Sequence, residues 1–224
     1  MKSEEQKVLL LVGSPKKKQS ASYALGTYLL KQLQRDSLLT ETLHIYSFVY
    51  KKNTLEQLYQ SFENSDIIIL SIPLYVDSIP SPVIQMMEYV AKKRAENREK
   101  IQQFMVIINC GFPEALHNYT AIEICKCFSD ECEFNWLGGF PLGGGPIING
   151  RTLTDVGRLG KNARKSIDII ATAINSAKTI PLEAKEIMNK SVIPARIYRF
   201  MGNIGWKRQA KEFGVKKKIK NRPY

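Results

Sequence analysis

Serines and lysines follow directly on the first apolar run of the chain, in the segment GSPKKKQSAS at residues 13–22. If a helix begins after this segment, its free amides and the positive end of its dipole attract an anion such as phosphate. The segment has neither the G-x-x-x-x-G-K-[ST] nor the G-x-G-x-x-G spacing of nucleotide-binding loops. The residues alone leave two interpretations open, a phosphate site or a helix N-terminus with solvated lysines.

Three further loops carry residues of unusual type. PLYVDSIPSP spans residues 73–82, NCGFPE spans residues 109–114, and the glycine-rich GGFPLGGGPIING spans residues 138–150. The prolines of the first of these loops exclude a helix or a central strand and fix its backbone. Gly111 in the second permits a close approach of the backbone to a ligand. Each of these three loops follows a short apolar run, and the segment at residues 13–22 does so too.

The apolar runs alternate with segments of helical periodicity. We predict strands at residues 7–12, 43–48, 66–72, 104–109 and 133–138. We predict helices at residues 20–34, 55–62, 83–98, 115–128 and 161–178. This alternation is typical of an α/β fold with a doubly wound parallel sheet. Ligands of such sheets bind at the carboxyl ends of the strands, where all four loops fall, so we expect the loops to form one site.

The loop segments VGSPKKKQSAS, SIPLYVDSIPSPV and NCGFPE, in this order and each after a buried strand, resemble those of the flavodoxin-like NAD(P)H-dependent FMN reductases and related quinone reductases. The resemblance extends over roughly residues 7–175. It implies a flavodoxin-like five-stranded parallel sheet of order 2-1-3-4-5, a bound FMN, NAD(P)H as co-substrate and a homodimer.

Carried over position by position, the resemblance implies three groups of cofactor-binding residues. The loop at the FMN phosphate consists of Ser14, Lys16, Ser20, Ala21 and Ser22. One edge of the flavin ring is lined by Pro73, Leu74, Tyr75 and Val76, and the other by Asn109, Cys110, Gly111 and Phe112. The chain departs from the family where Lys16 stands for a frequent arginine and Ala21 for an asparagine. A lysine offers a point charge without the bidentate fork of arginine, so the phosphate affinity is expected to be lower.

Several residues near these loops have more than one interpretation. Tyr75 can stack on the ring or fill the core. We interpret Cys110 as a packing residue, and Asp77 and Glu114 as loop and helix-start residues rather than acid–base groups. We predict no catalytic side chain. No metal site is predicted either, because the C-x-C-x4-C spacing of residues 125–132 matches no common zinc or iron–sulfur pattern.

The expected function is that of an FMN-dependent NAD(P)H oxidoreductase, which passes a hydride through the flavin to a small acceptor such as a quinone, a nitro or azo compound, or a flavin. The cofactor supplies the chemistry in such enzymes, which agrees with the lack of an evident general base. Two alternatives remain, an FMN-bound electron carrier of the flavodoxin type and a binding protein that acts through a basic tail.

The basicity of the chain is concentrated at its C-terminus. Of a formal net charge of +12, residues 196–224 contribute +9, with ten lysines and arginines against one glutamate. We therefore divide the 224 residues into a flavodoxin-like FMN-binding domain, residues 1–180, and a basic helical extension, residues 181–224. The extension is expected to pack on its own domain or on a dimer partner. Attraction of anionic NADPH or of a partner, and contact with nucleic acid or a membrane, are its other possible roles.

No segment approaches the roughly 18 consecutive apolar residues of a membrane span. The short N-terminal apolar run does not resemble a signal peptide, and free cysteines are typical of a reducing compartment. We expect a soluble cytoplasmic protein whose partner is a small-molecule electron acceptor. We expect no membrane partner, and the sequence does not favour nucleic acid as a partner.

Overall fold

The computed structural model describes residues 5–33, 38–50, 54–97, 100–148, 150–219 and 221. The chain forms two compact units, Met1–Val192 and Ile193–Tyr224. Among the described residues, no helix is long and apolar enough to cross a bilayer.

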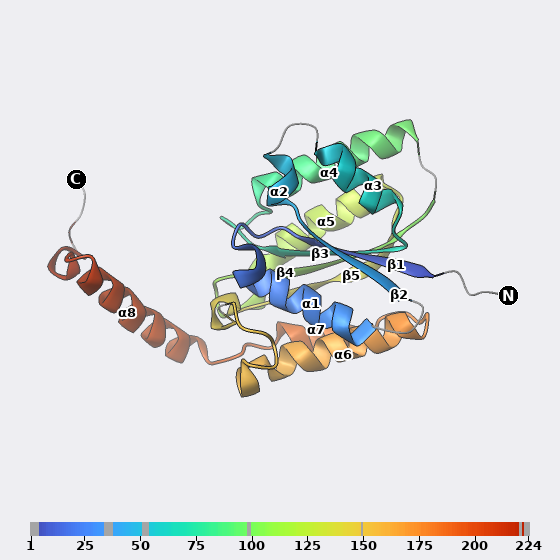
Figure 1. Ribbon diagram of the computed structural model, residues 1–224. Coiled ribbons are helices and arrows are strands. Elements are labelled where there is room, and N and C mark those ends of the chain that lie inside the picture. Colours follow the sequence, from blue (N-terminus) through green and yellow to red (C-terminus); the bar gives the residue numbers. More distant parts are fainter. Residues whose placement is uncertain are drawn as a thin grey trace. The chain divides into compact units, whose positions relative to one another are not determined.

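The first unit is built on a five-stranded sheet whose order is β2-β1-β3-β4-β5 and whose neighbouring strands are all parallel (Figure 1). Its strands are β1 (Gln6–Val12), β2 (Leu38–His44), β3 (Ile67–Pro73), β4 (Gln103–Asn109) and β5 (Asn135–Leu142). This arrangement confirms the predicted flavodoxin-like α/β fold.

Helices cover both faces of the sheet (Figure 1). One face carries α1 (Ala21–Leu33), α6 (Lys161–Asn175) and α7 (Leu182–Asn189). The other face carries α2 (Tyr46–Val49), α3 (Leu55–Glu63), α4 (Ser81–Glu96) and α5 (Tyr119–Glu131). Short 3-10 turns lie at Lys17–Gln19, Ala115–Asn118, Gly145–Ile147 and Gly157–Gly160. The strand β1 shows why the apolar runs are continuous: Leu9 and Leu11 face one helical layer, whereas Val8 and Leu10 face the other.

Two strand predictions were wrong, and both concern the edges of the sheet. The second strand is Leu38–His44 rather than residues 43–48, and Tyr46–Val49 is a helical turn. Because β2 is an edge strand whose middle residues are exposed, its sequence LLTETLH has no continuous apolar run.

The last strand extends to Leu142, through residues that we predicted to be part of a glycine-rich loop. An edge position tolerates Pro141, because a strand with a single neighbour need not use every amide. Gly139 is required by packing, since a Cβ there would lie 2.3 Å from a methyl group of Ile122 on α5.

The chain after α6 divides between the two units. Helix α7 packs against α6 and β5 and belongs to the first unit. The second unit contains α8 (Ala195–Glu212) and a 3-10 turn at Lys216–Lys218. The predicted packing of the C-terminal extension on its domain or on a partner stays a prediction.

Candidate functional site

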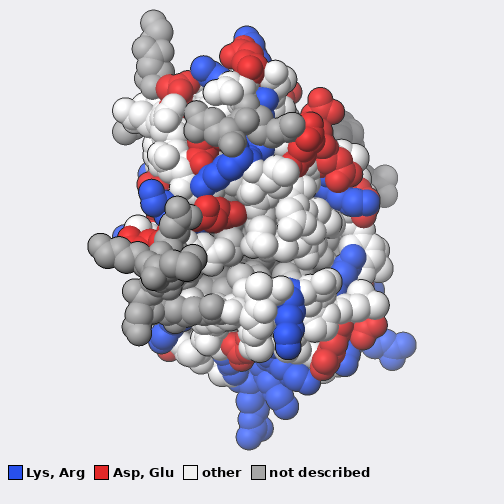
Figure 2. Space-filling view, turned by 90° about the vertical axis from the view of Figure 1, so that its right-hand side faces the viewer, with Lys and Arg blue, Asp and Glu red and all other residues white. Residues whose placement is uncertain are grey.

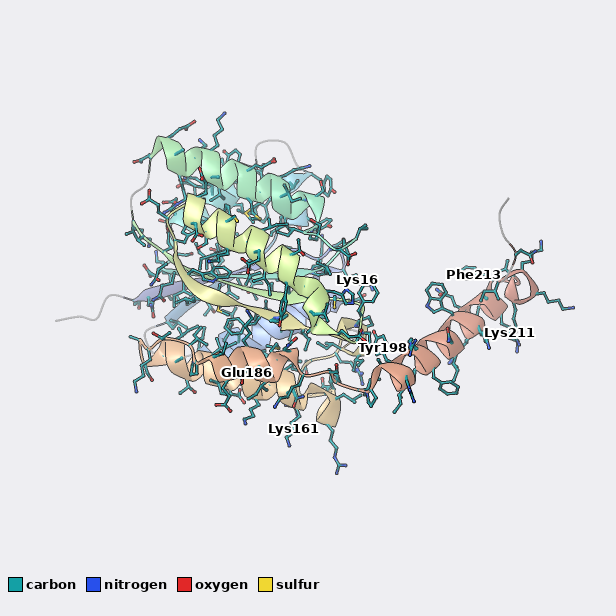
Figure 3. All side chains as sticks on the ribbon, turned by 180° about the vertical axis from the view of Figure 1, so that it is seen from behind. Lys16, Lys161, Glu186, Tyr198, Lys211 and Phe213 are labelled. Atoms are coloured by element: carbon teal, nitrogen blue, oxygen red, sulfur yellow. The ribbon has the colours of Figure 1, made fainter. Side chains whose placement is uncertain are left out.

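A cavity of about 270 Å³ lies at the carboxyl edge of the sheet, where the four polar loops meet. Its lining residues come from the loops after β1, β3, β4 and β5. They are Ser14, Lys16, Gln19, Ser20, Ala21, Ser22, Pro73, Leu74, Tyr75, Asn109, Cys110, Gly111, Gly145 and Pro146. Figure 3 shows Lys16 at this end of the first unit. Segments more than 100 residues apart in the chain thus form one site, as expected for this topology.

Most of the predicted site residues line this cavity, and two do not. Val76 is fully exposed, and Phe112 is half exposed with its ring 4.2 Å from that of His117. Three lining residues were missed, namely Gln19, Gly145 and Pro146. The glycine-rich segment was expected at this edge, but no spacing within it distinguished the two residues that reach the cavity.

The first loop ends in a capped helix N-terminus. The Ser20 hydroxyl accepts a hydrogen bond from the amide of Tyr23 (3.0 Å) and donates one to the carbonyl of Lys17 (2.6 Å). Ser20 therefore acts as the N-cap of α1. The hydrogen bonds of the described residues include none from the amides of Ala21 and Ser22, which lie in the first turn and line the cavity. Two free amides at a positive helix end form an anion site.

Two buried side chains hold this turn against the sheet. The Asn109 amide group donates to the Ser22 hydroxyl (2.8 Å) and to the Ile72 carbonyl (3.0 Å). The Ser71 hydroxyl donates to the carbonyl of Ser22 (2.7 Å). The ends of β3 and β4 thus fix the position of the α1 N-terminus, so that its amides are oriented before any ligand arrives.

The second loop is a tight hairpin. Tyr75 and Ser78 exchange two backbone hydrogen bonds of 3.0 and 3.1 Å. The two residues between them, Val76 and Asp77, have φ values of +50° and +56°. This left-handed pair matches a type I′ turn, which is unfavourable for a β-branched valine. The turn places the half-exposed Tyr75 ring in the cavity wall, and burial raises the pKa of its hydroxyl.

The third and fourth loops are joined by backbone hydrogen bonds. The amides of Gly144 and Gly145 donate to the carbonyls of Phe112 (2.6 Å) and Cys110 (2.9 Å). A Cβ at Gly145 would lie 2.6 Å from the Asn109 side-chain oxygen, so only glycine fits there. A Cβ at Gly111 would meet nothing within 4 Å. The space that a side chain at position 111 would occupy is therefore open.

Two titratable groups in or near the loops have pKa values shifted by their surroundings. Burial raises the pKa of the Cys110 thiol, whose sulfur lies 3.5 Å from the carbonyls of Phe112 and Glu114. The raised pKa favours the neutral thiol, which is a weaker nucleophile than a thiolate. Burial, followed by the charges of Lys17 and Lys18, lowers the pKa of His44 at the end of β2. The described residues contain no cluster of histidine, cysteine or carboxylate groups that could hold a metal ion.

The two ends of the cavity differ in chemistry. Free amides, serine hydroxyls and the Lys16 ammonium group meet at the α1 end, whereas Pro73, Leu74 and Tyr75 form a largely apolar wall. The site therefore fits an elongated ligand with a phosphate at one end and a flat ring at the other. Residues that could hold FMN are present, and none of them needs to move out of a packed core.

Comparison with known proteins agrees with this geometry. The family model described as NADPH-dependent FMN reductase matches residues 6–117, which is half of the chain. None of the curated proteins matches the sequence significantly.

Solved structures share the fold at low sequence identity. An FMN-dependent NADH-azoreductase from Bacillus anthracis, in complex with FMN, matches with a TM-score of 0.55 and 14% identity over 76% of this chain and 100% of its own. The Trp repressor binding protein from Bacillus subtilis matches with a TM-score of 0.55 and 12% identity over 72% and 98%. General stress protein 14 from Treponema denticola, in complex with FMN, matches with a TM-score of 0.53 and 11% identity over 73% and 98%.

Proposed function

Because the chain belongs to the NADPH-dependent FMN reductase family, we propose that the cavity at the carboxyl edge of the sheet is its FMN site and that it reduces a small organic acceptor with electrons from NAD(P)H. Membership makes the chain an oxidoreductase that uses FMN and NAD(P)H. The acceptor class is proposed to be a quinone, an azo or nitro compound, or a free flavin.

The observation that carries the proposal is the pair of free amides at the start of α1. Asn109 and Ser71 hold Ser22 in place, and Lys16 adds a positive charge beside the same turn. In the proposed complex, the FMN phosphate accepts hydrogen bonds from the amides of Ala21 and Ser22. The Ser14 hydroxyl donates a further hydrogen bond to it, and the Lys16 ammonium group offsets part of its negative charge.

The walls of the cavity position the ring. We propose that Pro73, Leu74 and Tyr75 contact one edge and that Cys110 and Gly111 contact the other, as the loops after β3 and β4 both line the cavity. The Leu74 amide donates to the Asn109 carbonyl (2.8 Å), so the two loops keep a fixed separation. When bound, FMN supplies the ring nitrogen that accepts and passes on hydride. The protein binds, orients and partly desolvates it without a general base.

The exposed apolar residues near the cavity support a homodimer. Phe112, Leu116 and Tyr119 are exposed and lie in or directly after the loop that follows β4. We propose that a second copy covers them. Sedimentation equilibrium of the wild type and of Leu116→Asp tests this, with a dimer expected for the first and a monomer for the second; a monomeric wild type would contradict it.

Anaerobic reduction tests the proposed function. The protein purified with FMN is mixed with NADPH and, separately, with NADH, while the visible flavin absorbance is followed. Bleaching by at least one of them, followed by reoxidation with a quinone or an azo dye, is expected. If neither nucleotide bleaches the flavin, the reductase assignment is wrong and a carrier that exchanges electrons only with protein partners is favoured.

A further inference from the structure

The C-terminal unit, Ile193–Tyr224, exposes large apolar side chains that it cannot bury by itself. Among its described residues, only Ala210 is buried. Trp206 and Phe213 are 73% and 74% exposed. The other exposed apolar residues of the unit are Ile197, Phe200, Met201, Ile204, Val215 and Ile219. Exposed apolar area on this scale marks an interaction surface.

The apolar residues are ordered along α8. Ile197, Phe200, Met201 and Ile204 recur at helical spacing and therefore share one face of the first half of the helix. The same face continues into Arg208 and Lys211 in the last turns. Figure 3 shows the side chains of Lys211 and Phe213 on opposite sides of the helix. The face thus changes from apolar to cationic along its length.

A defined cap carries the chain from α8 into a run of lysines. The amide of Val215 donates to the carbonyl of Ala210 (2.8 Å), and that of Gly214 donates to the carbonyl of Lys211 (3.0 Å). Gly214 has a φ of +68°, so the helix ends in a Schellman motif. The turn at Lys216–Lys218 follows at once and keeps its lysines next to the exposed Phe213 and Val215.

The charged side chains of this unit are almost all cationic. The described cations are Arg196, Arg199, Lys207, Arg208, Lys211, Lys216, Lys217 and Lys218, and Glu212 is the only acid in the sequence from residue 193 onward. The rest of the chain carries only +3, and acidic and basic side chains are interspersed over much of the face of the protein in Figure 2. A surface that complements the C-terminal unit must therefore be strongly anionic. It must also accept the apolar side chains of α8.

We propose that the C-terminal unit is a peripheral membrane anchor that binds bilayers rich in anionic lipid. A bilayer interface accepts the Ile, Phe and Met side chains of this face at the acyl boundary and lysines and arginines at the phosphates. Trp206 is two residues from Ile204, so it lies on the opposite side of the helix and is not part of this face. Nucleic acid would complement the cations but would leave the aliphatic face exposed. A second copy, or the nearly balanced first unit, would complement the apolar residues but not the charge. This proposal replaces the expectation from sequence that a membrane is not a partner, and it does not depend on bound FMN.

Vesicle sedimentation of the full-length protein tests the proposal. The probes are vesicles of phosphatidylcholine alone and of phosphatidylcholine with phosphatidylglycerol, at physiological ionic strength. The variant Lys216→Glu/Lys217→Glu/Lys218→Glu changes the net charge of the tail. Its matched control, Lys92→Glu/Lys126→Glu/Lys161→Glu, changes the charge of exposed residues of the first unit by the same amount. A third variant, Phe200→Ser/Ile204→Ser, removes apolar side chains without changing charge.

The wild type and the control variant are expected to bind the anionic vesicles alike and to leave the phosphatidylcholine vesicles unbound. The tail variant is expected to bind more weakly by at least about 100-fold, since each lost cation contributes about fivefold near an anionic surface and the three added carboxylates are repelled by it. The Phe200→Ser/Ile204→Ser variant is expected to bind about tenfold more weakly. Three results would overturn the proposal: no binding to anionic vesicles, equal losses in the tail variant and its control, or competition by duplex DNA that removes the protein from the vesicles.

Discussion

Replacing Asn109 with alanine is expected to lower both the free energy of unfolding and the affinity for FMN. The Asn109 side chain is 6% exposed and donates to the Ser22 hydroxyl and the Ile72 carbonyl at 2.8 and 3.0 Å. Two buried hydrogen bonds of about 1 kcal/mol each, with an acceptor left unpaired, give a loss of about 2–4 kcal/mol. Urea denaturation of the protein without FMN measures this loss.

Asn118 provides a matched control for this experiment. Its side chain is fully buried and also makes two hydrogen bonds, to the carbonyls of Ala115 (3.1 Å) and Leu142 (3.2 Å), but it does not line the cavity. Asn118→Ala should destabilise the fold by a similar amount and leave FMN binding unchanged. Asn109→Ala should weaken FMN binding about tenfold, or about 1.4 kcal/mol, because Ser22 loses its tether. Fluorescence titration with FMN measures the affinity of each variant and so separates a loss of FMN binding from a loss of stability. Equal effects of both variants on FMN affinity would refute the assigned role of Asn109.

Three further predictions concern the scaffold. Val76→Asn should raise the free energy of unfolding by about 1 kcal/mol, because asparagine tolerates the φ of +50° that Val76 adopts; an unchanged urea midpoint would contradict this. Arg94→Met should cost about 3–5 kcal/mol, since it leaves the Glu63 carboxylate, 2.7 Å from Arg94, without its buried partner. Arg94→Met/Glu63→Met should recover only the part due to the unpaired carboxylate in the same denaturation assay, because Gln102 and the carbonyls of Cys132 and Lys100 lose their donor in both variants; full recovery would contradict this. The pKa of His44 is lowered in the folded chain, so below about pH 6.5 the unfolded chain binds more protons than the folded one and the free energy of unfolding falls. His44→Asn should therefore flatten this part of the curve of stability against pH. An unaltered slope would exclude His44 as its source.

The central strands were predictable because both of their faces are buried. β1, β3 and β4 each have neighbours on both sides and helices above and below, so their sequences are apolar without interruption. The edge strands lack this signal. β2 is partly exposed. β5 contains a glycine that packs under α5 and a proline that an edge tolerates, and both residue types also occur in loops.

The loops of the candidate site were predictable as loops, but the contacts that orient them were not. Asn109 could be placed in the site because it lies at the end of an apolar run. Its hydrogen bond to Ser22 could not be predicted, because the two residues are 87 positions apart. No spacing in the sequence encodes that pairing. Gly145 and Pro146 were missed for the same reason, because they reach the cavity only once β5 has extended to Leu142.

A crystal structure of the protein grown with FMN tests the central claim most directly. We predict density for the phosphate within hydrogen-bonding distance of the amides of Ala21 and Ser22, and for the ring between Tyr75 and Gly111. Density for FMN elsewhere, or a cavity without FMN at saturating concentration, would contradict the assignment of this cavity as the cofactor site.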